Sequence, residues 1–139
     1  MSRIVNRIFS GLSNLRGVFN PAKKLTEEQT KLIPYRDFAQ SLLNAKGISK
    51  KDVMVEICHP FKPDETAITF VIKRPNYSGE KIRKQYSAIY ETARKLSECI
   101  PVNPKTTFII HEAGNEGYEF PPTKMEVNDR NELTFETLR

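Results

Sequence analysis

The chain has 139 residues, of which 38% are hydrophobic and 28% are charged. This length allows one domain with a buried core and leaves no room for a second full domain, and the composition excludes wholesale disorder. No apolar run approaches the roughly 20 residues that cross a bilayer, and two cysteines are too few for a disulfide framework. We therefore expect an intracellular protein of a reducing compartment, cytoplasmic or mitochondrial.

The net charge of +5 comes entirely from the start of the chain. Residues 1–26 carry five basic side chains and no acidic one, whereas the remaining 17 Lys and Arg match the 17 Asp and Glu in number. Residues 112–139 hold seven acids against three bases. We therefore divide the chain into a basic N-terminal segment, residues 1–24, and a single domain, residues 25–139, that ends in an acidic segment.

Residues 3–19 are predicted to form an amphipathic helix. At 100° per residue, large apolar side chains cover about half of its circumference, and basic and polar side chains cover the rest. Such a helix can dock on a partner protein, lie on an anionic membrane surface as a peripheral membrane contact, or complete the core of its own domain. The contact residues would be Arg3, Ile4, Arg7, Ile8, Phe9, Leu12, Leu15, Arg16 and Phe19.

The same segment supports a different interpretation. It is amphipathic, contains Arg and Ser, and has no acidic residue, which is typical of a mitochondrial targeting sequence. In that case residues 1–24 would have no role in the mature protein.

The next predicted element begins at a capping box. Thr26 and Gln29 have the spacing at which the hydroxyl and the amide satisfy two free backbone N–H groups at a helix start. Pro34 predicts a kink or break, followed by a helix over residues 35–46 that Gly47 ends. The expected inward-facing residues of this helix are Tyr35, Phe38, Ala39, Leu42 and Leu43.

Alternating patterns predict two strands, residues 53–58 and 67–73, joined by a proline-containing turn as an antiparallel hairpin. A long helix over residues 78–99 carries one apolar stripe, and a third strand follows at residues 106–111. A strand, a helix and a strand in this order predict a crossover connection between two parallel strands.

A weaker pattern predicts a last hairpin of Met125–Val127 and Leu133–Phe135 around residues 128–131. Together these elements predict an α+β fold. It would be a two-layer sandwich, with a mixed sheet of three to five strands covered by helices on one face and preceded by the N-terminal amphipathic helix.

Five cations and one acid gather between Lys73 and Lys84, around the predicted start of the long helix. Free backbone N–H groups and basic side chains there could hold a phosphate or carboxylate, and the tyrosine could stack on a base. A solvated basic helix end is the alternative. The residues of a nucleic-acid or anion site would be Lys73, Arg74, Tyr77, Lys81, Arg83 and Lys84.

The cysteines and histidines lack the closely spaced pairs that mark zinc sites. Neighbouring residues on a strand also point to opposite faces, so Cys58 and His59 are poorly placed to bind one ion. We therefore assign no metal site and no cofactor.

The most enzyme-like cluster is His111 and Glu112 with Glu116 and Glu119 on the following loop. No second catalytic group is marked by spacing, so no catalytic residue is assigned. The sequence predicts a non-enzymatic interaction protein whose N-terminal helix docks on a partner protein or an anionic membrane surface. A nucleic-acid-binding module that uses the Lys73–Lys84 region is the alternative.

Overall fold

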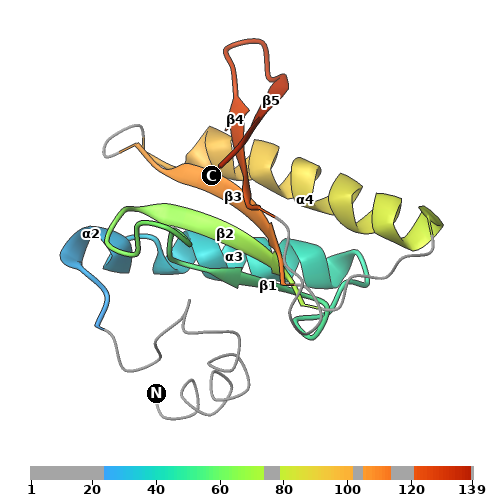
Figure 1. Ribbon diagram of the computed structural model, residues 1–139, viewed down its shortest axis with the longest axis horizontal. Helices are drawn as coiled ribbons and strands as arrows, with labels where there is room; N and C mark the ends of the chain where they lie inside the picture. Colours follow the sequence, from blue (N-terminus) through green and yellow to red (C-terminus); the bar gives the residue numbers. More distant parts are fainter. Residues whose placement is uncertain (1–23, 74–78, 102–104, 114–120, 139) are drawn as a thin grey trace.

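In the computed structural model, five strands form one mixed sheet that carries helices on one face (Figure 1). The structure describes residues 24–73, 79–101, 105–113 and 121–138, so the predicted helix over residues 3–19 lies outside the described residues. The elements in chain order are α2 (Glu27–Thr30), α3 (Ile33–Ala45), β1 (Val53–Glu56), β2 (Ala67–Ile72), α4 (Gly79–Cys99), β3 (Thr107–Glu112), β4 (Thr123–Val127) and β5 (Leu133–Thr137). The predicted α+β architecture with a mixed sheet is confirmed.

The strands lie in the order β1-β2-β3-β4-β5. β2 and β3 run parallel, with Ala67 beside Thr107 and Ile72 beside Glu112, and the other three neighbouring pairs are antiparallel. Parallel strands need a long connection, which the 21-residue helix α4 supplies. The predicted crossover is confirmed, and so are both predicted hairpins.

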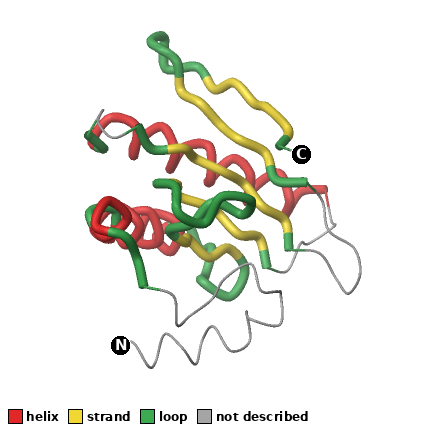
Figure 2. The backbone as a smooth tube through the Cα atoms, turned by 60° about the vertical axis from the view of Figure 1, so that its left-hand side comes forward, coloured by secondary structure: helices red, strands yellow, loops and turns green. Residues whose placement is uncertain are grey.

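The main core lies between the sheet and the helices α3 and α4, which lie on one face of the sheet (Figure 2). We call this side the helix face and the opposite side the second face. Side chains alternate between the two faces along each strand, so every other strand residue enters this core. The sheet contributes Val53, Val55, Ile68, Phe70, Ile72, Phe108, Ile110 and Met125, and the helices contribute Ala39, Leu43, Ala88, Ile89, Ala93 and Leu96.

The predicted break is confirmed, since α2 ends at Thr30 and α3 begins at Ile33, but the predicted start of the second helix at residue 35 is wrong by two residues, because Pro34 lies inside the first turn of α3. A proline is tolerated there because the first N–H groups of a helix have no partner within the helix. The inward prediction for Phe38 is also wrong, since its side chain is 44% exposed. Ala39 and Leu43 form the buried stripe of α3. Phe38 lies about 100° away from Ala39 around the helix axis, so its side chain falls outside this stripe. Gly47 ends the helix as predicted, at φ 83°.

The hairpin of β4 and β5 is held by its turn. The Asn128 side-chain Oδ1 accepts hydrogen bonds from the N–H groups of Arg130 at 2.8 Å and Glu132 at 2.9 Å. Asn131 follows in the left-handed region at φ 64°, a conformation that asparagine tolerates well. Because the turn fixes the pairing, both strands extend further than the sequence predicts.

The outer edge of β1 is covered by a side chain of α3. Gln40 Oε1 accepts a hydrogen bond from the Val55 N–H at 3.0 Å, and Gln40 Nε2 donates to the Val53 carbonyl at 3.1 Å. The amide thus takes the place that a neighbouring strand would occupy, which protects this edge from pairing with another chain.

Replacing Gln40 with alanine should lower the free energy of unfolding by about 1–3 kcal/mol, because it leaves a partly buried donor and a partly buried acceptor of β1 without partners. Chemical unfolding of Gln40→Ala measures the change, and Ser41→Ala, an exposed position on the same helix, is the matched control. Equal stability of Gln40→Ala and Ser41→Ala would show that the bridge to β1 contributes nothing.

Candidate functional site

The second face of the sheet brings buried polar and titratable side chains together. The helices α3 and α4 pack on the helix face, yet all but one of the second-face residues of β1, β2 and β3 are at most 6% exposed, the half-buried Thr107 being the exception. The buried ones are Met54, Glu56, Ala67, Thr69, Val71, Ile109 and His111. A buried carboxyl and a buried imidazole on one apolar face make this the candidate functional site.

Glu56 is the most perturbed group of the second face. Burial raises the pKa of its carboxyl from 4.5 to about 8, and the positive charges of Arg36, Lys50 and Lys73 only partly oppose that rise. No hydrogen bond reaches its Oε2 from any described residue. The carboxyl is therefore protonated at neutral pH, because an isolated carboxylate is costly to bury.

The strand register fixes how these groups lie relative to one another. Glu56 is opposite Thr69, which is beside Ile109, whereas Met54 is opposite Val71, which is beside His111. Glu56 and His111 therefore lie in neighbouring rows and two strands apart, a separation of roughly 10 Å or more at the usual strand spacing. This arrangement gives no direct proton transfer between the two side chains.

The loop after β1 lies over one end of the second face. The His59 Nδ1 accepts hydrogen bonds from the N–H groups of Phe61 and Lys62, each at 3.1 Å, and burial lowers the pKa of this histidine. The hydroxyl of Thr69 donates to the Cys58 carbonyl. These contacts fix the loop, and His59 serves as a structural acceptor at Nδ1.

The four Cys and His residues weighed as zinc ligands do not all lie together. Cys58 follows β1, and Cys99 is exposed at the end of α4. The described residues contain no group of three or more His, Cys, Asp or Glu side chains that could hold a metal ion.

The candidate acid–base pair is divided by the sheet. His111 points to the second face, and Glu112, as the next residue of β3, belongs to the helix face. There Glu112 accepts a hydrogen bond from the hydroxyl of Tyr86 on α4, and burial, together with this contact, raises the pKa of Tyr86. Glu116 and Glu119 lie outside the described residues.

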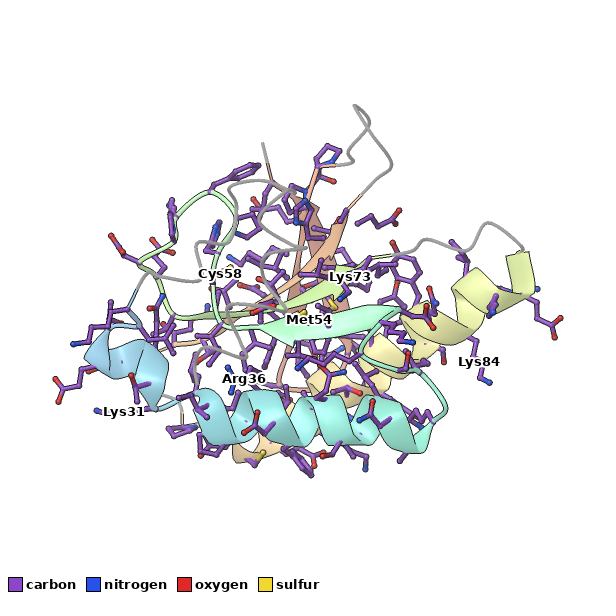
Figure 3. The ribbon with its side chains drawn as sticks, turned by 90° about the horizontal axis from the view of Figure 1, so that it is seen from below. Lys31, Arg36, Met54, Cys58, Lys73 and Lys84 are labelled. Carbon is purple, nitrogen blue, oxygen red and sulfur yellow. The ribbon has the colours of Figure 1, made fainter. Side chains whose placement is uncertain are left out.

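The basic residues predicted between Lys73 and Lys84 as an anion or nucleic-acid site do not form one cluster among the described residues. Lys73 lies beside Met54 near the middle of the view, with its Nζ 3.9 Å from the Met54 sulfur, whereas Lys84 points away from the body on the right (Figure 3). Lys81, Arg83 and Lys84 lie on the first turns of α4, where their side chains are exposed. Arg74 and Tyr77 lie outside the described residues.

A groove of about 890 Å³ lies between the end of α4 and the hairpin of β4 and β5. Three of its five charged side chains pair with one another, since Glu126 is 3.3 Å from the Lys124 Nζ and 3.5 Å from the Lys105 Nζ. These two lysines hold the pKa of the Glu126 carboxyl below its usual range. A charged ligand in this groove would therefore compete with ion pairs that Glu126, Lys105 and Lys124 already form.

Sequence reasoning missed Glu56 because strict alternation along residues 53–58 places it on a solvated face. The signal that could have found it is in β2, whose residues from Ala67 to Ile72 are all buried. Five of these six residues are apolar, on both faces of the strand. A strand that is apolar on both faces indicates a sheet that is buried on both faces.

Comparison with known proteins gives no match: no protein-family model, no curated protein and no solved structure is significantly similar to this chain.

The raised pKa of Glu56 predicts how stability depends on pH. Between pH 4.5 and about 8 the folded protein keeps a proton that the unfolded chain has released, so stability falls as the pH rises through this window and levels off above it. Glu56→Gln removes the ionisation. The variant should match the wild type near pH 4 and exceed its free energy of unfolding at pH 8, by an amount on the order of a few kcal/mol.

Chemical unfolding at a series of pH values measures this difference, with Glu98→Gln on the exposed side of α4 as the matched control. A stability gap between Glu56→Gln and wild type that stays constant from pH 4 to pH 8 would contradict the buried, protonated carboxyl.

Proposed function

We propose that this chain is a non-enzymatic interaction protein whose N-terminal amphipathic helix docks on a partner protein or an anionic membrane surface. The observation that supports the proposal is that α3 and α4 already cover the helix face of the sheet. Among the described residues, the core between the sheet and the helices α3 and α4 is built from residues 32–133, and the two helices pack against each other over it. This cover of the helix face supports docking of the apolar stripe of residues 3–19 on another molecule.

The second face of the sheet is not the continuous apolar surface that such a stripe requires. A helix with a half-circumference of Ile, Leu, Val and Phe is best buried against a continuous apolar surface. On the second face, Glu56, Thr69 and His111 stand among the apolar side chains. A surface outside the chain is the better complement, and this supports docking on another molecule.

The charge distribution supports the same proposal. From residue 27 onward acids and bases are equal in number, so the net charge of the chain belongs to the segment with the stripe. Apolar burial and attraction to an anionic surface then act on the same residues, and each basic side chain near anionic lipid contributes about 1 kcal/mol. Among the described residues, no helix is long and apolar enough to cross a membrane.

The contacts of the titratable side chains support binding over catalysis. His59 Nδ1 holds a loop, Glu112 binds Tyr86, and Glu126 pairs with two lysines. Each of these groups serves a structural contact, and His111 and Glu56 are too far apart for proton transfer between them.

The proposal predicts that a chain beginning at Leu25 folds as well as the full chain. The truncation should leave the free energy of unfolding unchanged within about 0.5 kcal/mol, because in this proposal the stripe docks on another molecule and contributes nothing to the fold of the isolated chain. It should abolish sedimentation with phosphatidylserine-containing vesicles, or capture of a partner protein. Ile8→Asp with Leu12→Asp in the full chain should have the same effect, and Ser10→Asp is the control on the polar arc.

Two results would overturn the proposal. If the chain beginning at Leu25 is strongly destabilised, the stripe belongs to the protein's own fold. If the full chain and the Ile8→Asp, Leu12→Asp variant bind vesicles and partner proteins equally well, the docking residues are wrong.

The exposed cations at the start of α4 support a second candidate function, nucleic-acid binding. Lys81, Arg83 and Lys84 present three positive charges to solvent within about one helical turn, close to the N-terminal end of the helix. Arg83→Glu with Lys84→Glu should weaken retention on a DNA or RNA column at least about tenfold and flatten its dependence on salt. Lys95→Glu with Lys51→Glu, both exposed elsewhere, is the matched control, and equal losses in the two double variants would argue against a defined site.

A further inference from the structure

The two edges of the sheet differ in how they are finished. Gln40 occupies the outward N–H of Val55 and the outward carbonyl of Val53, so the β1 edge is closed. No described residue pairs with the outer edge of β5, and four of its five residues are exposed. The β4 and β5 hairpin also stands out from the rest of the molecule, which leaves this edge accessible (Figure 1).

The hydrogen bonds at both ends of the hairpin show which β5 amides point outward. The Asn128 N–H donates to the Glu132 carbonyl, and the Leu138 N–H donates to the Pro122 carbonyl. Bonded and non-bonded pairs alternate in an antiparallel ladder, so Thr134 and Glu136 also direct their amides to β4. The N–H and carbonyl groups that face the outer edge are those of Leu133, Phe135 and Thr137, and no described residue pairs with them.

An aromatic row ends at the same edge. The rings of Tyr86 and Tyr90 on α4 are 6.0 Å apart, and the ring of Phe135 follows at 5.3 Å from Tyr90. The Phe135 side chain is 50% exposed, which leaves the outer half of a large apolar ring uncovered. Such a ring on an unpaired strand indicates an interaction surface.

We propose that β5 pairs with β5 of a second copy of this chain, antiparallel and with a two-fold axis through the Phe135 pair. The two sheets then form one continuous sheet. In this register Phe135 is opposite its counterpart, and Leu133 is opposite Thr137 of the second copy, so all three outward residues find hydrogen-bond partners. The two Phe135 rings cover each other and extend the aromatic row from one copy to the next.

Charge favours this antiparallel pairing over a parallel one. The antiparallel pairing places Glu136 opposite Thr134 of the second copy, whereas a parallel pairing in register would place Glu136 directly opposite Glu136. Because the β1 edge is closed by Gln40, the assembly ends at two copies and does not grow into a fibre.

The size and charge of the contact predict a weak dimer that salt strengthens. Two five-residue strands bury less than the roughly 1,200 Å² typical of stable complexes, so we expect a dissociation constant in the micromolar range or above. Each copy carries +5 overall, and residues 121–138 hold four acids and two bases. The two copies repel each other through their net positive charge, and the two hairpins repel each other through their net negative charge. Salt screens both repulsions and should therefore favour association.

Sedimentation velocity of the full chain over a concentration series tests the proposal. We expect a monomer–dimer equilibrium, and about tenfold or more weaker association for Thr137→Pro, which removes one outward N–H per copy and leaves the β4 ladder intact. Thr137→Ala keeps the N–H and is the control. Because a proline could disturb the hairpin, Phe135→Glu is a second variant, which places two like charges on the axis.

Phe38→Glu, at an exposed aromatic residue of α3 far from β5 in the fold, controls for the loss of an apolar surface residue. Dimers of wild type, Thr137→Ala and Phe38→Glu together with weakened dimers of Thr137→Pro and Phe135→Glu support the pairing. A wild-type chain that stays monomeric up to several hundred micromolar would overturn it, and so would dimers that persist unchanged in both β5 variants.

Discussion

The parallel pairing of β2 with β3 is the constraint on which the rest of the structure depends. The crossover that this pairing requires is α4, which packs beside α3 over the helix face. It also makes β2 an inner strand that is buried along its whole length, on both faces. A strand of this kind needs apolar side chains in every position, and β2 has them except at Thr69, whose hydroxyl binds the Cys58 carbonyl.

Burial on both faces also explains the unusual chemistry of the second face. The glutamate of β1 lies opposite Thr69, and with no described partner for Oε2 it keeps its proton up to about pH 8. The same sheet separates neighbouring strand residues, so His111 and Glu112 serve different layers. The pair His111 and Glu112, which is compact in sequence, is thereby divided between the two faces of the sheet.

Much of the fold could be predicted because the relevant signals are local. The capping box at Thr26, the apolar stripe of α4 and the stop at Gly47 act within a few residues of chain. The second face could not be predicted, since the burial of Glu56 depends on strands and segments distant in sequence. The bridge from Gln40 to β1 has no sequence signal either, because it joins residues 13 and 15 positions apart through one rotamer.

The central claim is that residues 3–19 bury their apolar stripe on another molecule and not in the protein's own core. Amide hydrogen exchange of the full chain, followed by mass spectrometry of its peptides, tests this claim most directly. The account predicts that the amides of β2 and β3 exchange slowest and that those of residues 3–19 exchange at close to the rate of an unstructured peptide in the isolated protein. Protection of residues 3–19 equal to that of α3 in the isolated protein would contradict it.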